Sequence, residues 1–175
     1  MSKRSSGVWF GLGLILPSVV VGGAFWYRSV VFDQNCGGLL VRAANANTIP
    51  LAHAELDRAV KYLESEGLTD GYTSVWYQTP DEDIGFWYKN LVEARSELKS
   101  LTEKGEGKVS ALEQSNTLLK LRDTLTTNKG QGGESLTYPD GISRYPNNAV
   151  MGLFAILSGL FAFVGFITVG LDTKK

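Results

Sequence analysis

The sequence predicts an all-α membrane protein, in which two transmembrane helices flank an extracytoplasmic antiparallel helical bundle of three to four helices. Two apolar stretches without charge, residues 5–27 and 145–171, predict the transmembrane helices. Each holds about 20 apolar residues, enough at about 1.5 Å per residue to cross a hydrocarbon core about 30 Å thick. Between them, residues 28–148 contain all but four of the 17 Lys and Arg and all but one of the 18 Asp and Glu, a composition typical of a water-soluble domain.

These stretches divide the chain into six segments. The segments are a cytoplasmic tail (1–7), transmembrane helix 1 (8–27), an extracytoplasmic helical domain (28–126), a loop (127–148), transmembrane helix 2 (149–171) and a second cytoplasmic tail (172–175). Both short ends are basic, with Lys3 and Arg4 before the first span and two lysines at the C-terminus. Short basic segments stay in the cytoplasm, whereas long loops are translocated largely regardless of charge. We therefore expect both termini in the cytoplasm and residues 28–148 outside it.

A cleaved signal peptide is the alternative to the first transmembrane helix. The basic start and the small residues at 22–24 fit a signal peptide. The apolar run is longer than a usual signal core, however, and it ends in the aromatic residues 25–27, which are typical of a membrane interface. We therefore expect a retained helix. Cys36 follows the span and is either a partly buried free thiol, the favoured interpretation, or half of an intermolecular bridge.

The first helix of the soluble segment is predicted at about residues 51–66, where apolar residues recur at helical spacing. Thr48 is a candidate N-cap. Gly67 suits the C-terminal end, and leucines on either side of it provide the hydrophobic pair of a Schellman motif. The preceding residues 29–47 either continue the first transmembrane helix or break from it at a Gly-Gly pair, and the sequence leaves both open.

The acidic and aromatic stretch "YQTPDEDIGFWYKN" (77–90) predicts the start of a long helix. Thr79 is a candidate N-cap and Glu82 completes a capping box, which assigns the acids to a helix end rather than to a calcium loop. Apolar residues then recur at heptad spacing, which predicts a buried stripe. The stripe comprises Ile84, Trp87, Leu91, Ala94, Leu98 and Leu101. The next helix begins at Ser110, with Glu113 completing its capping box, and packs antiparallel because the connecting loop is short.

Aromatic residues gather around the start of this long helix. Residues 71–78, "GYTSVWYQ", predict an ordered loop because an isolated strand has no partner, and we expect its aromatic rings to pack over the helix ends. Phe86 and Tyr88 lie about 100° to either side of Trp87 and therefore flank the buried stripe. The aromatic residues either close the bundle or form a partly exposed contact surface, and we take five as candidates for partner binding. The candidates are Tyr72, Trp76, Tyr77, Phe86 and Tyr88.

The most specific motif of the chain is "TPDEDIGFWYKNL" (79–91), which ends a longer run over residues 42–91. Together with "QSNTLLKLRDTL" (114–125) and "PDGISRYPNN" (139–148), this run resembles a family of bacterial two-span membrane proteins without an assigned function. The resemblance implies the architecture and a bacterial source, hence an inner or internal membrane with residues 28–148 periplasmic or lumenal. It implies no catalytic residue.

The architecture predicts a membrane-anchored, non-enzymatic accessory or assembly subunit that binds other membrane proteins, or further copies of itself, through its helical domain and spans. Small residues four positions apart let helices approach closely in lipid, and the same rows also suit pairing of the two spans of one chain. The rows are Gly7 and Gly11, Ser18 and Gly22, Ala155 and Gly159, and Ser158 and Ala162. The alternative is an extracytoplasmic ligand-binding, sensor-like module that signals through a partner, since the C-terminal "DTKK" is too short for an output domain.

Catalysis is not expected. His53, near Glu55 and Asp57, is the one candidate base, and no nucleophile motif, phosphate loop or metal-ligand spacing accompanies it. One Cys and one His are too few for a zinc cluster, and a net charge of −1 provides no basic field for nucleic acid. The expected partners are therefore membrane proteins and the lipid bilayer, with no cofactor and no nucleic acid.

Overall fold

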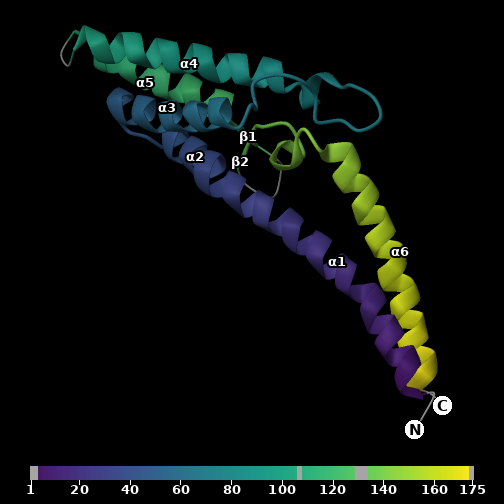
Figure 1. The fold of residues 1–175 in the computed structure, drawn as a ribbon. Helices are drawn as coiled ribbons and strands as arrows, with labels where there is room; N and C mark the ends of the chain where they lie inside the picture. The colour runs from purple at the N-terminus through teal and green to yellow at the C-terminus, as the bar shows by residue number, and fades with distance from the viewer. Residues whose placement is uncertain (1–3, 106–107, 129–133, 174–175) are drawn as a thin grey trace.

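The computed structural model describes residues 4–105, 108–128 and 134–173, and it is mostly helical, as predicted. Figure 1 shows a helical bundle at one end of the molecule and two long helices that converge toward both chain termini at the other. The helices are α1 (Arg4–Phe32), α2 (Gly38–Ala44), α3 (Ile49–Ser65), α4 (Ile84–Lys104), α5 (Ala111–Leu125) and α6 (Asn148–Thr173). Shorter elements are a π-helical turn (Asp33–Gly37), 3₁₀ turns (Pro80–Glu82 and Ile142–Arg144) and strands β1 (Thr126–Asn128) and β2 (Glu134–Leu136).

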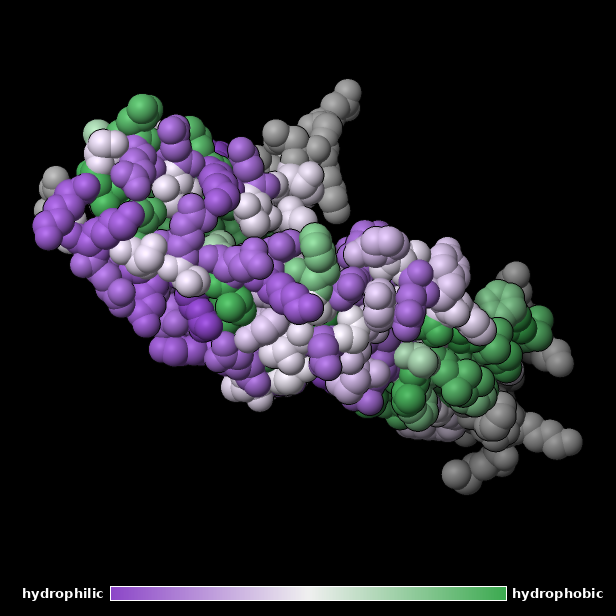
Figure 2. Space-filling model, turned by 90° about the horizontal axis from the view of Figure 1, so that it is seen from above, coloured by the Kyte–Doolittle hydropathy of each residue, from purple (hydrophilic) through white to green (hydrophobic). Residues whose placement is uncertain are grey.

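Among the described residues, two helices are long and apolar enough to cross a membrane: α6, and α1 together with its continuation into α2. Hardly any of their most apolar length is buried within the chain, unlike the core helix of a soluble protein. In Figure 2 the bundle surface is mainly hydrophilic, and hydrophobic surface gathers over the long helices.

Glycine lets α1 and α6 pack closely near the chain ends. A Cβ atom on Gly11 would lie 2.6 Å from Cγ2 of Val169, and one on Gly165 would lie 2.6 Å from the Gly11 carbonyl oxygen. Farther from the chain ends, the Ser18 hydroxyl of α1 donates a hydrogen bond to the Ser158 carbonyl of α6. The small residues at these positions therefore pair the two helices of one chain. By contrast, Cβ atoms on Gly22 and Gly159 would meet nothing within 4 Å, so those positions stay open.

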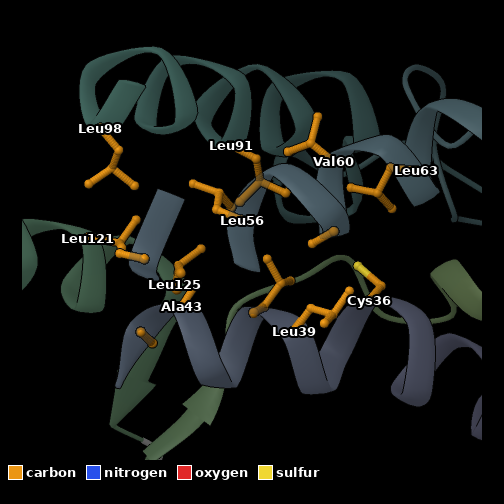
Figure 3. Close-up of a cluster of buried hydrophobic side chains, with 14 of the residues drawn as sticks. Cys36, Leu39, Ala43, Leu56, Val60, Leu63, Leu91, Leu98, Leu121 and Leu125 are labelled. Carbon is orange, nitrogen blue, oxygen red and sulfur yellow. The ribbon is translucent and has the colours of Figure 1, made fainter. Parts of the chain in front are cut away.

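The first long helix continues beyond the predicted span, through the π-helical turn and into α2, which ends at Ala44. Its continuation packs against α3 and α5, and α3 also packs against α4. Figure 3 shows side chains from all four bundle helices meeting in one core, among them Leu39, Leu56, Leu91 and Leu121. The predicted heptad stripe of α4 is confirmed: five of its members are buried, and Ala94 is half-buried against the core.

Cys36 lies in this core with no exposed surface, and its thiol is free, so a surface-exposed intermolecular bridge does not fit this fold. Burial, with a smaller contribution from the nearby Asp33 carboxylate, raises the pKa of the Cys36 thiol to about 12. The thiol is therefore free, as in the favoured interpretation from the sequence, but it is fully buried rather than partly buried.

Two predicted helix ends are confirmed. After α3, Gly67 adopts a φ of +67° and the amide of Leu68 donates to the carbonyl of Leu63 at 2.8 Å, which is the predicted Schellman motif. Before α5, the Ser110 hydroxyl accepts a hydrogen bond from the amide of Glu113 at 3.1 Å. Thr48 occupies the N-cap position of α3, but its side chain makes no capping hydrogen bond.

The predicted start of α4 at Thr79 is wrong. Thr79 instead opens the 3₁₀ turn, where its hydroxyl contacts the Glu82 carboxylate, and Asp83 caps α4 by accepting a hydrogen bond from the amide of Phe86 at 2.9 Å. The physical reason is a tertiary contact: an isolated antiparallel β-bridge joins Asp83 to Tyr72. This bridge holds the backbone of Asp83 extended, so a helix cannot run through it.

The predicted loop over residues 127–148 also needs correction. β1 pairs antiparallel with β2, with Thr126 opposite Leu136, and residues 129–133 of the predicted loop lie outside the described part of the chain. Leu136 packs against the bundle core, which fixes the pair to the domain. The Ile142–Arg144 turn then leads into α6 and is held to α1 by Arg28, whose Nε donates to the Ser143 carbonyl at 3.1 Å.

Candidate functional site

The most exposed aromatic surface of the bundle lies where the loop after α3 enters α4. Backbone hydrogen bonds tie the two arms of this loop together, from Thr73 to the Glu82 carbonyl at 3.1 Å and from Ile84 to the Gly71 carbonyl at 2.9 Å. These bonds fix where the loop leaves the bundle and where the first turn of α4 begins. The residues between the arms form the projecting tip seen in Figure 1.

The structure divides the five predicted partner-binding residues into two groups. Trp76, Tyr77 and Phe86 are exposed, at 90%, 75% and 63% of their surface. Tyr72 and Tyr88 are half-buried. The expectation that the loop aromatics pack over the helix ends is therefore wrong for Trp76 and Tyr77, because the loop arms pair with each other and carry both side chains outward.

Tyr88 has a structural role. Its hydroxyl donates to the Glu64 carboxylate of α3 at 3.0 Å, and Arg95 of α4 lies 3.4 Å from the same carboxylate. Burial and the neighbouring Glu64 carboxylate raise the pKa of the Tyr88 hydroxyl. Tyr88 therefore joins α3 to α4. Trp87, one residue earlier, joins α4 to the segment after β2, because its indole nitrogen donates a hydrogen bond to the Thr137 carbonyl at 2.8 Å.

Beside the exposed ring of Phe86, a pocket of about 310 Å³ lies between the start of α4 and the segment after β2. Aromatic side chains of Phe86, Trp87 and Tyr138 contribute to its walls, together with three carboxylates. The carboxylates belong to Asp81, Asp83 and Asp140. Among the residues that the structure describes, no ion pair involves any of the three.

Nothing matches in comparisons of this chain with protein families, curated proteins and solved structures.

Carboxylates and aromatic faces together suit a positively charged group, because both attract a cation and the ring faces do so at short range. The pocket unites residues that the sequence did not connect. Asp81 and Asp83 were assigned to a helix end, whereas Tyr138 and Asp140 lie far along the chain in the predicted loop. Burial raises the pKa of the Tyr138 hydroxyl, and the carboxylates of Asp33 and Asp140 add smaller contributions in the same direction.

The three polar residues considered for catalysis do not form a site together. Glu55 is buried and pairs with Arg42 at 2.5 Å, and Asp57 pairs with Lys61 at 2.7 Å. The hydrogen bond from Lys61 lowers the pKa of the Asp57 carboxyl, so this group stays ionised and engaged. His53 is half-buried on the same helix. Within the described ranges, no group of three His, Cys, Asp or Glu side chains is arranged to hold a metal ion.

Proposed function

We propose that this protein is a non-enzymatic accessory or assembly subunit, anchored in a bacterial inner or internal membrane, that binds other membrane proteins or further copies of itself. In this proposal residues 8–27 and 149–171 cross the membrane, both termini are cytoplasmic, and residues 28–148 are periplasmic or lumenal. The long apolar helices, the convergence of the start of α1 and the end of α6 at one end of the molecule, and the basic residues at both ends of the sequence support this arrangement.

The observation that carries the binding proposal is Phe86 beside the pocket at the start of α4. A large apolar ring exposed at 63% stands on a helix capped by Asp83, next to the pocket carboxylates of Asp81 and Asp140, which form no ion pair with any described residue. Interfaces commonly combine an apolar anchor on a rigid element with charges that the partner complements. A fitting partner presents an apolar surface to Phe86 and a Lys or Arg side chain to the pocket. The open glycines Gly22 and Gly159 offer a second contact surface within the spans.

Co-purification from membranes in mild detergent tests this proposal. We expect Phe86→Ala, and separately the double substitution Asp81→Asn and Asp140→Asn, to lose the partner while keeping the wild-type unfolding temperature. Leu112→Ala is the matched control, because Leu112 is an apolar side chain of similar exposure, at 71%, but lies on α5. A partner that stays bound to both Phe86→Ala and the double variant would show that this surface is not the interface.

A ligand-binding, sensor-like module is the second candidate function, and the pocket itself favours it. Its volume of about 310 Å³ lies at the lower end of the range for small-molecule sites. Its aromatic and carboxylate walls suit a small organic cation. This function predicts that the purified protein is monodisperse without a partner and that organic amines raise its unfolding temperature. Asp140→Asn should abolish that rise, and its persistence would exclude the pocket as the site.

A further inference from the structure

We propose that the loop tip, defined as Val75, Trp76 and Tyr77, inserts into the interface of the lipid bilayer beside the start of α6. This inference rests on the membrane arrangement proposed above. In this arrangement Trp76 and Tyr77 contact lipid, whereas Phe86 remains the anchor for a protein partner.

The composition of the loop tip first indicates such a role. Its three consecutive large side chains are exposed at 46%, 90% and 75%. Elsewhere in the described bundle, exposed large hydrophobic residues occur singly, as is normal for a soluble surface. Residues 71–80 carry no charge and the nearest acidic residues, Asp70 and Asp81, flank this stretch, so the loop tip itself brings no ionised group to the membrane.

The position of the loop supplies the second observation. Gly71, at the base of the loop, packs so closely against the ring of Tyr145 that a side chain on Gly71 would collide with the Tyr145 hydroxyl. Tyr145 lies three residues before α6 begins at Asn148. The loop is therefore fixed to the junction between the bundle and the second apolar helix, and Figure 1 shows it projecting beside the start of α6.

The side chains of the loop tip are of the kinds that favour the interface of a lipid bilayer. Trp and Tyr side chains favour the headgroup level, where the rings meet acyl chains and the polar ends stay hydrated. Trp26 and Tyr27, exposed at the bundle side of the first apolar run, provide the same chemistry on α1. Exposed Trp and Tyr side chains of the kind that favour the interface thus occur both on α1 and on the loop tip.

Backbone polarity sets the depth of insertion. Irregular backbone leaves amide and carbonyl groups without internal partners, and such groups are not tolerated facing hydrocarbon. The loop tip therefore reaches the headgroup region and the outermost acyl segments only. With α1 and α6 it forms a third contact with the membrane, which fixes the tilt of the bundle and the direction in which Phe86 faces.

Fluorescence quenching in vesicles tests this inference on the full chain. Val75→Cys is labelled with an environment-sensitive fluorophore and reconstituted into phosphatidylcholine vesicles containing nitroxide lipids. The native thiol does not interfere, because Cys36 is buried. Ser115→Cys, on the exposed face of α5, is the water-facing control, and Leu153→Cys, on the exposed face of α6, is the membrane control.

We expect the label at position 75 to emit at shorter wavelength than at position 115 and to be quenched several-fold more strongly, with shallow nitroxides more effective than deep ones. Adding Trp76→Ser and Tyr77→Ser should bring position 75 to the level of position 115. Quenching at 153 but not at 75 would overturn the insertion while leaving the membrane arrangement intact. Absence of quenching at both positions would overturn both proposals.

Discussion

Leu91 offers the sharpest test of the bundle core, because it belongs to the predicted heptad stripe and is only 1% exposed. In Figure 3 its side chain points from α4 toward the layer that contains Leu56 of α3. Leu91→Ala removes three carbon atoms, which at about 0.8 kcal/mol per buried methylene loses about 2.4 kcal/mol of transfer free energy. The cavity left behind adds to this, so we expect a total cost of about 3–4 kcal/mol.

The assay is thermal unfolding of the full chain in detergent, followed by far-ultraviolet circular dichroism and by tryptophan fluorescence. For a bundle of this size, a cost of about 3 kcal/mol corresponds to a fall in midpoint of roughly 10 °C or more. Leu119→Ala is the control, because Leu119 is exposed on α5 and should change stability by less than about 0.5 kcal/mol. If Leu91→Ala unfolds at the wild-type temperature, the α4 stripe does not face a core and the helix packing described here is wrong.

Three further predictions use the same unfolding measurement. Asp83→Ala should lower the free energy of unfolding by about 1 kcal/mol because Asp83 caps α4, whereas Thr79→Ala should lower it by less. If Thr79→Ala is the more costly substitution, the helix start predicted at Thr79 is correct after all. Gly11→Ala should destabilise the chain because its Cβ would collide with α6, while Gly22→Ala, which points into open space, should not; equal effects would contradict the helix pairing. Because the folded state raises the pKa of Cys36 from 9.0 to about 12, its thiol ionises first in the unfolded chain, so stability should fall between pH 9 and 12. Cys36→Ala should make this fall shallower, and an unchanged slope would show that the thiol does not contribute.

Sequence patterns predicted the elements whose geometry is decided by nearby residues. The Schellman ending at Gly67 and the cap at Ser110 each depend on a few consecutive positions, and both are observed. The heptad stripe of α4 is likewise encoded within the helix that carries it. Thr79 marks the limit of such reasoning, because its local capping motif is as good as that at Ser110. The bridge between Tyr72 and Asp83, a tertiary contact, nevertheless moves the helix start to Ile84.

The candidate site was less predictable because its parts come from distant segments. The aromatic residues were found from their density in the sequence, but exposure distinguishes Phe86 from Tyr88, and exposure follows from packing against α3. Tyr138 and Asp140 reach the pocket through the β1–β2 pair, whose strands of three residues are too short to show alternation. Gly71 carries no local signal of its contact with Tyr145.

The composition of the particle released from native membranes tests the central proposal most directly. The full chain, extracted in mild detergent and measured by native mass spectrometry, should appear in a complex of fixed stoichiometry with another membrane protein or with further copies of itself. That complex should be lost on Phe86→Ala and kept on Leu112→Ala. A wild-type protein that leaves the membrane only as a single 175-residue chain, under conditions that preserve other membrane complexes, would contradict the account.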